Sequence, residues 1–268
     1  MPETPKTAEA HGTAFHGPSF HGKVAVVTGA GTGIGRTSAR AFAARGATVV
    51  VADVDAGSAA ETVELIEKDG GTASAVTVDV TDSASVAAMV DTAVARHGGL
   101  HIAHNNAGIL AALGPLGDVD EGQWHAQLAV NVTGVMLAMK YEIRHMREHG
   151  GGVIVNAASN IGGHIRYPGM GAYAATKAAV SALTRVAALD HIKDGIRINA
   201  VSPGAANTRM SLMPGETEAD RAARFSDVIP LGRIAETHEI VGSVLWLASD
   251  ASSFVVGHDL VTDGGASA

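Results

Sequence analysis

The chain alternates between short, continuously apolar runs and longer amphipathic stretches. The apolar runs predict strands at 23–28, 48–52, 75–80, 100–104, 152–157, 196–201 and 259–262. The amphipathic stretches predict helices at 37–45, 59–68, 83–97, 124–148, 173–192 and 237–249. Strands that alternate with helices indicate a parallel sheet, and continuously apolar strands are typical of a sheet buried on both faces. We therefore expect an α/β fold with a doubly wound, mostly parallel, seven-stranded sheet and helices on both faces.

The domain organisation follows from where this alternation holds. It covers 23–268 without an internal repeat, and a chain of 268 residues suits one α/β domain, so we expect a single domain. Residues 1–22 are polar and contain proline and glycine, which predicts a flexible leader. The stretch 204–230 is long, weakly patterned and rich in glycine, proline and methionine. Long loops in compact domains are typically lids or binding loops, so we expect a substrate lid there.

Composition and charge argue against several classes of protein. A formal net charge of −8 without a basic stripe argues against nucleic-acid binding, and the absence of cysteine excludes disulfides and thiolate catalysis. No apolar run reaches the ~18 residues of a membrane-spanning helix. His11, His16 and His21 recur at a spacing that does not place them on one helix face, so we expect incidental histidines rather than a metal site. These features predict a cytoplasmic protein without nucleic-acid, membrane or metal partners.

A glycine-rich turn follows the first predicted strand and precedes a helix. It reads Thr-Gly-Ala-Gly-Thr-Gly-Ile-Gly-Arg over 28–36. Such a turn presents unpaired backbone N–H groups and the positive end of a helix dipole to an anion, and its glycines let the backbone approach a pyrophosphate. The position between strand and helix favours dinucleotide binding over an ordinary tight turn.

Asp53 ends the second predicted strand, about 20 residues after the turn, where an acidic side chain can accept a hydrogen bond from a ribose 2′-hydroxyl. The same carboxylate would repel a 2′-phosphate, no Lys or Arg follows in 54–56, and Thr32 in the turn is uncharged. This combination favours NAD over NADP as the cofactor. The alternative is that Asp53 or Asp55 caps the next helix, which would leave the cofactor unassigned.

Tyr173 and Lys177 lie four residues apart on a predicted helix and therefore share one of its faces. An unperturbed tyrosine, with a pKa of about 10, is a poor base at neutral pH. An adjacent ammonium group favours the tyrosinate, and a shift of about two to three units, roughly 3–4 kcal/mol, would bring the pKa into a useful range. We expect Lys177 to lower the pKa of Tyr173 in this way.

These motifs and several others, in a fixed order, resemble those of the short-chain dehydrogenase/reductase family, in its single-domain branch of about 250 residues. The resemblance extends from about Gly22 to Gly265. It rests on Thr28, Gly29, Gly33, Ile34, Gly35, Asp53, Asp79, Val80, Asn105, Asn106, Ala107, Gly108, Asn131, Ser159, Tyr173, Lys177, Pro203, Gly204, Thr208, Asp263, Gly264 and Gly265. It implies a Rossmann-type fold and hydride transfer between NAD(H) and a secondary alcohol or ketone.

The resemblance implies a catalytic set of four residues. Tyr173 would be the general acid/base at the substrate oxygen, and Lys177 would lower its pKa and bind the nicotinamide ribose. Ser159 would donate a hydrogen bond to the substrate oxygen. Asn131 would hold a water that links Lys177 to solvent. Taken alone, Ser159 is also compatible with a cap on the fifth strand, and Asn131 with a buried helix kink.

The resemblance also implies a cofactor site. Its expected members are Gly29, Thr32, Gly33, Ile34, Gly35, Asp53, Asp79, Val80, Asn106, Ala107, Gly108, Tyr173, Lys177, Pro203, Gly204 and Thr208. Asp79 and Val80 would contact the adenine end. Gly204 and Thr208 would hold the nicotinamide carboxamide and the neighbouring phosphate region.

The substrate is predicted only as a small or medium alcohol or ketone of modest polarity. The candidate pocket residues are Leu113, Ser159, Asn160, Gly162, His164, Tyr167, Met210, Met213 and Phe225. Methionines in 204–230 suit an adaptable apolar wall. Arg166 and Arg209 are candidates to bind an acidic group, although solvated surface arginines are the more ordinary interpretation. A surface histidine is likewise the ordinary interpretation of His164.

The sequence leaves two rival interpretations. One is a nucleotide-sensing protein in which NAD(H) alters an interaction surface without turnover; the complete catalytic set argues against it. The other is a sugar-nucleotide epimerase of the larger branch, which carries a longer C-terminal substrate domain than the few residues after Gly265 allow. The resemblance further implies a homotetramer that packs through 124–146, 178–189 and the C-terminal strand.

Overall fold

The computed structural model describes residues 17–213 and 215–268. Most of the expected leader, including His11 and His16, lies outside the described residues. The described part already packs on the domain, because the Phe20 side chain is 3% exposed and meets Phe42 edge-to-face, with ring centroids 5.1 Å apart. Phe20 therefore packs on the domain, although it lies within the expected leader.

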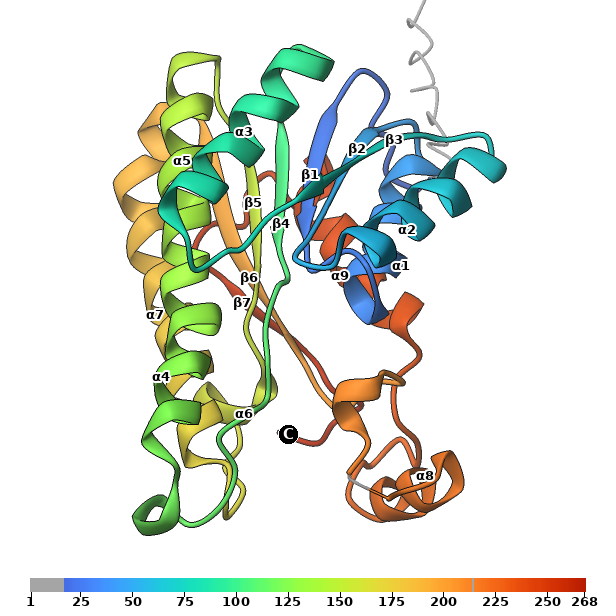
Figure 1. The fold of residues 1–268 in the computed structure, drawn as a ribbon, viewed down its shortest axis with the longest axis vertical. Coiled ribbons are helices and arrows are strands. Elements are labelled where there is room, and N and C mark those ends of the chain that lie inside the picture. Colours follow the sequence, from blue (N-terminus) through green and yellow to red (C-terminus); the bar gives the residue numbers. More distant parts are fainter. Residues whose placement is uncertain (1–16, 214) are drawn as a thin grey trace, which may run out of the picture.

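Seven strands form one sheet in the order β3-β2-β1-β4-β5-β6-β7, and every neighbouring pair is parallel. They are β1 (Val24–Thr28), β2 (Thr48–Asp53), β3 (Thr72–Thr77), β4 (Ile102–Asn105), β5 (Gly152–Ala157), β6 (Ile196–Pro203) and β7 (Asp259–Thr262). This confirms the predicted doubly wound sheet (Figure 1). The winding reverses between β1 and β4, and open parallel sheets bind ligands beyond the carboxyl ends of the strands at such a point.

Helices cover both faces of the sheet (Figure 1). One face carries α1 (Gly33–Ala43), α2 (Ala56–Lys68) and α9 (Thr237–Ala248), and the other carries α3 (Ser83–His97), α5 (Val135–Glu148) and α7 (Gly171–His191). Successive strand residues face opposite layers, so Val24 and Val26 join one core cluster whereas Ala25 and Val27 join the other. Burial of both faces explains why the strands read as continuous apolar runs.

Two predicted elements differ from those observed. The third strand occupies Thr72–Thr77 rather than 75–80. It is an edge strand with exposed threonines at both ends and half-buried Ala, Ser and Val side chains between them, so its first half carries no apolar run. The helix predicted at 124–148 consists of α4 (Glu121–Leu128), a π-helical turn η2 (Ala129–Gly134) and α5. The π-helical turn accommodates an extra residue without interrupting the amphipathic pattern, which is why the pattern alone does not reveal it.

The stretch 204–230 contains more regular structure than the sequence predicts. Helix α8 (Glu218–Ser226) begins with a capping box between Thr217 and Asp220. In Figure 1 it lies below the sheet, apart from the two helical layers and beyond the lower end of β6. The interpretation of this stretch as a substrate lid remains a prediction. Across the described ranges, no helix is long and apolar enough to cross a membrane.

A buried polar group beneath the sheet links β4 to α5. The Asn105 amide donates to the Glu142 carboxyl group (2.9 Å) and to the Asn156 side-chain oxygen (3.0 Å). The Glu142 side chain is fully buried, and no cation is among its hydrogen-bond or ion-pair partners within the described residues. Burial raises the pKa of Glu142 from its ordinary value of 4.5 to about 7, against the lowering effect of the Asn105 hydrogen bond.

Replacing Glu142 with glutamine tests this reading. A carboxyl group whose pKa is raised in the fold stabilises the protein fully below the unfolded value, and that contribution is lost as pH rises from about 4.5 to about 7. Glu142→Gln is therefore expected to match the wild type near pH 4.5 and to exceed its stability at pH 8, by at most ~3 kcal/mol. Denaturant unfolding at both pH values measures the difference. The buried His104, whose pKa is lowered to about 3, is present in both proteins, so its titration cancels in the difference between their free energies of unfolding. A constant difference across this range would contradict the assignment.

Candidate active site

The glycine-rich turn joins β1 to α1 as the sequence predicts. Gly29 and Gly33 adopt left-handed φ values of 63° and 52°, and a Cβ atom on Gly35 would overlap the carbonyl oxygen of Gly29. Helix α1 begins at Gly33, and its N-cap Thr32 makes no side-chain capping hydrogen bond. The first turn of α1 therefore keeps backbone N–H groups available to an anion.

Asp53 ends β2 beside this turn. Its carboxylate accepts hydrogen bonds from the backbone N–H groups of Gly31 (2.7 Å) and Asp55 (3.0 Å). Of the two residues considered as a helix cap, Asp55 is the one that caps α2, because its carboxylate accepts from the backbone N–H of Ser58 (2.9 Å). Asp53 is thus a carboxylate held against the glycine turn, and a Cβ on Gly31 would lie 2.8 Å from it.

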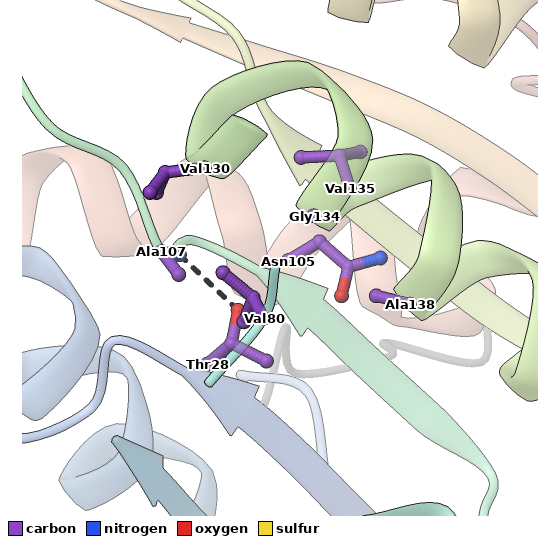
Figure 2. A pocket seen from close by; sticks show the side chains of 8 residues that line it. All are labelled: Thr28, Val80, Asn105, Ala107, Val130, Gly134, Val135 and Ala138. Carbon is purple, nitrogen blue, oxygen red and sulfur yellow. Dashed lines mark hydrogen bonds between the residues drawn. The ribbon is translucent and has the colours of Figure 1, made fainter. Parts of the chain in front are cut away.

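Hydrogen bonds join the carboxyl ends of β1 and β4. The Thr28 hydroxyl accepts from the backbone N–H groups of Asn106 and Ala107, both at 3.1 Å. The Asn106 amide donates to the carbonyl oxygens of Thr28 (3.0 Å) and Gly29 (3.2 Å). Figure 2 shows the Thr28–Ala107 bond at the edge of a small pocket. We call these hydrogen bonds of Thr28 and Asn106 the β1–β4 clamp.

The pocket in Figure 2 is a small hollow without room for a water molecule. It is lined by Thr28, Val80, Asn105, Ala107, Val130, Gly134, Val135 and Ala138. Val80 packs against Gly134, where a Cβ would lie 2.9 Å from Val80 Cγ2. The neighbouring Asp79 carboxylate accepts from the N–H (2.9 Å) and hydroxyl (2.7 Å) of Thr81, which hold the pKa of Asp79 below its usual range. Val80, predicted for the adenine side, and Ala107, predicted for the cofactor site, therefore line one pocket beside the clamp.

Three buried side chains gather at the carboxyl end of β5. Ser159 follows β5 and caps the short helix α6 (Asn160–Gly163), its Oγ accepting from the N–H of Ile161 (3.1 Å). Tyr173 and Lys177 lie one turn apart on α7, with Lys177 Nζ 5.7 Å from the Tyr173 ring centroid. Lys177 Nζ donates to the Ala157 carbonyl oxygen at 2.8 Å. The strand end, the cap and the helix thus bring together residues that are 18 positions apart in the chain.

Burial shifts the two titratable groups of this set in opposite directions. It raises the pKa of Tyr173 to about 12, against the lowering effect of a hydrogen bond with Ser159, and it lowers the pKa of Lys177 to about 8. The protein's own groups raise the pKa of Tyr173 and do not produce the lowering that was expected from Lys177. The physical reason is that desolvation of the phenolate is the largest influence on this pKa, and Lys177 is not among the groups that shift it.

Asn131 occupies the π-helical turn η2 and is fully buried. Its side chain accepts from the N–H of Ile109 (2.8 Å) and donates to the carbonyl of Ile109 (2.9 Å) and to the Thr176 hydroxyl (3.2 Å). A Cβ on Gly108 would lie 3.4 Å from Asn131 Oδ1 and 3.5 Å from Lys177 Nζ, so the two groups converge at Gly108. The structure therefore joins Asn131 to the catalytic set, while its role in a water relay remains a prediction.

The segment after β6 reaches the glycine turn from the other side. A Cβ on Gly204 would lie 2.6 Å from the Asp263 Cβ, which explains why glycine is needed where this segment passes the chain end. A Cβ on Gly33 would lie 3.3 Å from Thr208 Cγ2. Thr208 therefore faces the first residue of α1, as a residue that shares the cofactor site would.

Several predicted substrate-pocket residues bind other parts of the protein. The His164 imidazole pairs with the Asp259 carboxylate (3.3 Å), and the Asn160 amide donates to the Asp263 carboxylate (3.2 Å). Gly162 packs on α7, and Phe225 lies beneath the Arg224 guanidinium at 4.3 Å. The apolar or aromatic side chains that remain largely exposed are Leu113, Tyr167, Met210 and Met213. Arg166 and Arg209 are also exposed.

Two polar residues near the site escape the sequence analysis. Gln127 on α4 is fully buried and accepts from the N–H groups of Ala111 (2.8 Å) and Ala112 (3.2 Å), so it shapes the segment that leaves β4. Arg221 on α8 is buried against the segment that contains Thr208. Each is a lone polar residue in an amphipathic pattern, and only the fold shows what it contacts. Among the described residues, no cluster of His, Asp or Glu is arranged to hold a metal ion.

Comparison with known proteins agrees with this geometry. The family model adh_short_C2, described as enoyl-(acyl carrier protein) reductase, matches residues 29–267. The cis-4-hydroxycyclohexanecarboxylate dehydrogenase of Sinomonas cyclohexanicum is 43% identical over 93% of this chain and 98% of its own. A short-chain type dehydrogenase/reductase from Mycobacterium marinum superimposes with a TM-score of 0.87 at 38% identity, covering 92% of this chain and 96% of that one.

A second solved structure is a 7α-hydroxysteroid dehydrogenase in complex with NADH and 7-oxo glycochenodeoxycholic acid. It superimposes with a TM-score of 0.85 at 32% identity, covering 92% of this chain and 95% of that one. The family model and the relative each match most of the chain, and the seven-stranded sheet and the ordered motifs are those expected of such proteins. The chain belongs to the short-chain dehydrogenase/reductase family.

Proposed function

We propose that this oxidoreductase uses NAD(H) to interconvert a secondary alcohol and a ketone on an alicyclic ring. The observation that carries the proposal is the buried Ser159–Tyr173–Lys177 set, which Gly108 and the β1–β4 clamp connect to the glycine turn and the uncapped N-terminus of α1. The ring is suggested by the two similar proteins named above, one named for a hydroxycyclohexane carboxylate and the other bound to an oxo bile acid. The exposed Leu113, Met210 and Met213 suit an apolar ring of this kind.

The residues present fit a dinucleotide. Glycine at 33 and 35 lets Thr208 and the Gly29 carbonyl group approach the first turn of α1 closely, and the clamp holds Ala107 where β1 and β4 end. The cofactor would lie along Gly29, Thr32–Gly35, Asn106–Gly108 and Pro203–Thr208, with Asp53 at its adenosine ribose. When bound, nicotinamide supplies the hydride acceptor or donor. Asp53 favours NAD over NADP because its carboxylate would accept from a 2′-hydroxyl and repel a 2′-phosphate.

Tyr173 and Ser159 present two hydroxyl groups to one substrate oxygen. Ser159 donates a hydrogen bond to that oxygen and stabilises negative charge on it. The raised pKa of Tyr173 keeps its phenol protonated at neutral pH, so it is ready to give its proton to the oxygen in the reduction direction. In oxidation the deprotonated, phenolate form of Tyr173 takes the alcohol proton. Lys177, held by the Ala157 carbonyl, places its ammonium group near the nicotinamide ribose and near Tyr173.

Exposed apolar side chains support self-association of this enzyme into a homotetramer. On α7, Val186 and Leu189 are 59% and 75% exposed, and Phe254, shortly before β7, is fully exposed. Such residues gain from contact with another copy of the chain. The predicted cytoplasmic location is retained as part of the same proposal.

Tyr173→Phe tests the catalytic assignment. The variant keeps the ring but loses the hydroxyl, so turnover is expected to fall about 10²–10⁴-fold while NADH still binds. Turnover is followed at NADH absorbance with cyclohexanol-type alcohols and the matching ketones, and binding by fluorescence titration. Tyr141→Phe is the matched control, because the Tyr141 hydroxyl bonds only to Ser83 among the described residues and lies outside the site.

Near-normal turnover in Tyr173→Phe would contradict the assigned role of the phenol. Tight NADH binding by the wild type without turnover of any alcohol or ketone would instead favour the nucleotide-sensing interpretation.

Asp53→Asn tests the choice of cofactor. Asparagine keeps an oxygen that accepts from Gly31 but removes the charge, so the ratio of kcat/KM for NAD to that for NADP is expected to fall at least about tenfold. Asp55→Asn removes a charge two positions away while keeping a capping side chain, so its ratio should stay near that of the wild type. Equal ratios in both variants would show that the enzyme does not read the 2′ position through Asp53.

A further inference from the structure

Arg221 is an arginine on α8 whose side chain lies inside the protein. It is 3% exposed, although α8 itself is largely exposed. Its Nη1 donates to the Thr208 carbonyl (3.0 Å) and the Ser211 hydroxyl (3.2 Å), and its Nη2 donates to the Asn207 side-chain oxygen (2.6 Å). All three acceptors belong to Asn207–Ser211, so one guanidinium fastens α8 to this short segment.

These acceptors are neutral. Among the described residues Arg221 forms no ion pair, and the nearby Glu216 is engaged with Arg224 by bonds of 2.7 Å to both of its oxygens. Burying a guanidinium without a paired carboxylate costs free energy, so the arrangement is a poor source of stability. What it provides is geometry, because the planar fork of arginine fixes the direction of several acceptors at once.

The segment held by Arg221 leads directly to the predicted cofactor site. Its start is fixed to the domain, because the N–H of Asn207 donates to the Ala235 carbonyl (2.8 Å). The Thr208 carbonyl accepts from both Arg221 and Ser211, the latter at 2.9 Å, which leaves the Thr208 side chain directed at Gly33. Arg221, Thr208 and Gly33 therefore form a continuous path from α8 to the N-terminus of α1.

We propose that Arg221 is a positioning residue that couples the lid helix α8 to cofactor binding, by fixing Asn207–Thr208 against the phosphate-binding turn of α1. Cofactor and lid then act as one unit: NADH bound at the first turn of α1, beside Thr208, would stabilise α8 in its place, and a well-placed α8 would keep Thr208 ready for NADH. The inference rests on the proposed NAD(H) function and adds to it a residue that does not touch the reacting atoms.

Arg224 supplies a matched control on the same helix. It lies one turn further along and binds Glu216 and the Ser211 carbonyl (2.8 Å), but it makes no hydrogen bond to Asn207 or Thr208. Removing it loosens the lid internally while leaving the path from Arg221 to Gly33 unchanged. Comparing the two variants therefore distinguishes an arginine that only stabilises the lid from one that couples the lid to the cofactor site.

The test compares Arg221→Met, Arg221→Lys and Arg224→Met with the wild type. Fluorescence titration gives the Kd of NADH, and limited proteolysis or hydrogen exchange over 209–226, with and without NADH, reports the lid. Arg221→Met is expected to weaken NADH binding about tenfold or more and to abolish NADH-induced protection of the lid. Arg221→Lys keeps the charge but lacks the fork, so an intermediate loss is expected. Arg224→Met should lower lid protection without NADH and leave the Kd within about twofold.

Three results would overturn the coupling. In the first, Arg221→Met binds NADH with the Kd of the wild type and shows the same NADH-induced protection of the lid. In the second, Arg224→Met loses as much NADH affinity as Arg221→Met. In the third, the wild type binds NADH but 209–226 gains no protection. Thermal melting shows whether Arg221→Met folds. If Arg221→Met does not fold, the comparison is made with Arg221→Lys instead. A wild type that binds neither NADH nor NADPH would overturn the proposed function as well, which distinguishes the two failures.

Discussion

The hydrogen bonds between the carboxyl ends of β1 and β4 set the geometry on which the rest of the site depends. In a parallel sheet these two ends separate where the winding reverses, and each carries backbone groups that the next strand cannot pair. Thr28 and Asn106 satisfy those groups and bring the glycine turn beside Ala107 and Gly108. Because Gly108 also lies beside Asn131 and Lys177, the same contacts relate the dinucleotide turn to the catalytic helix.

Desolvation is the dominant electrostatic effect in the catalytic set. It favours the neutral forms of both Tyr173 and Lys177, and so moves their pKa values apart, to about 12 and about 8. A tyrosine that remains a phenol is a proton donor, and a lysine whose pKa is about 8 is still mostly charged at neutral pH. The protein alone thus prepares the set for protonating a substrate oxygen, and further positive charge in the site would favour the reverse transfer.

Polar residues around the substrate side serve mainly to hold segments in place. His164 and Asn160 fix α6 to Asp259 and Asp263, Gln127 fixes the segment after β4, and Arg221 fixes the segment after β6. These fixed segments leave the apolar or aromatic Leu113, Tyr167, Met210 and Met213 exposed, together with the charged Arg166 and Arg209. Specificity for a ring of modest polarity is consistent with such a surface, with direction supplied by the hydroxyl pair of Ser159 and Tyr173.

The sequence by itself determined the sheet and the order of its elements, and it supplied the motifs on which the proposed catalytic and cofactor sites rest. It does so because apolar runs, glycine turns and the Tyr173–Lys177 spacing are local features of the chain. Tertiary structure alone decided which polar side chains reach the site, since Arg221 and Gln127 stand 13 and 16 positions from the residues they hold. It also reversed the expected shift of the Tyr173 pKa, moved β3 to Thr72–Thr77 and placed the π-helical turn at Asn131. These outcomes depend on burial and on packing between distant segments, which no local pattern records.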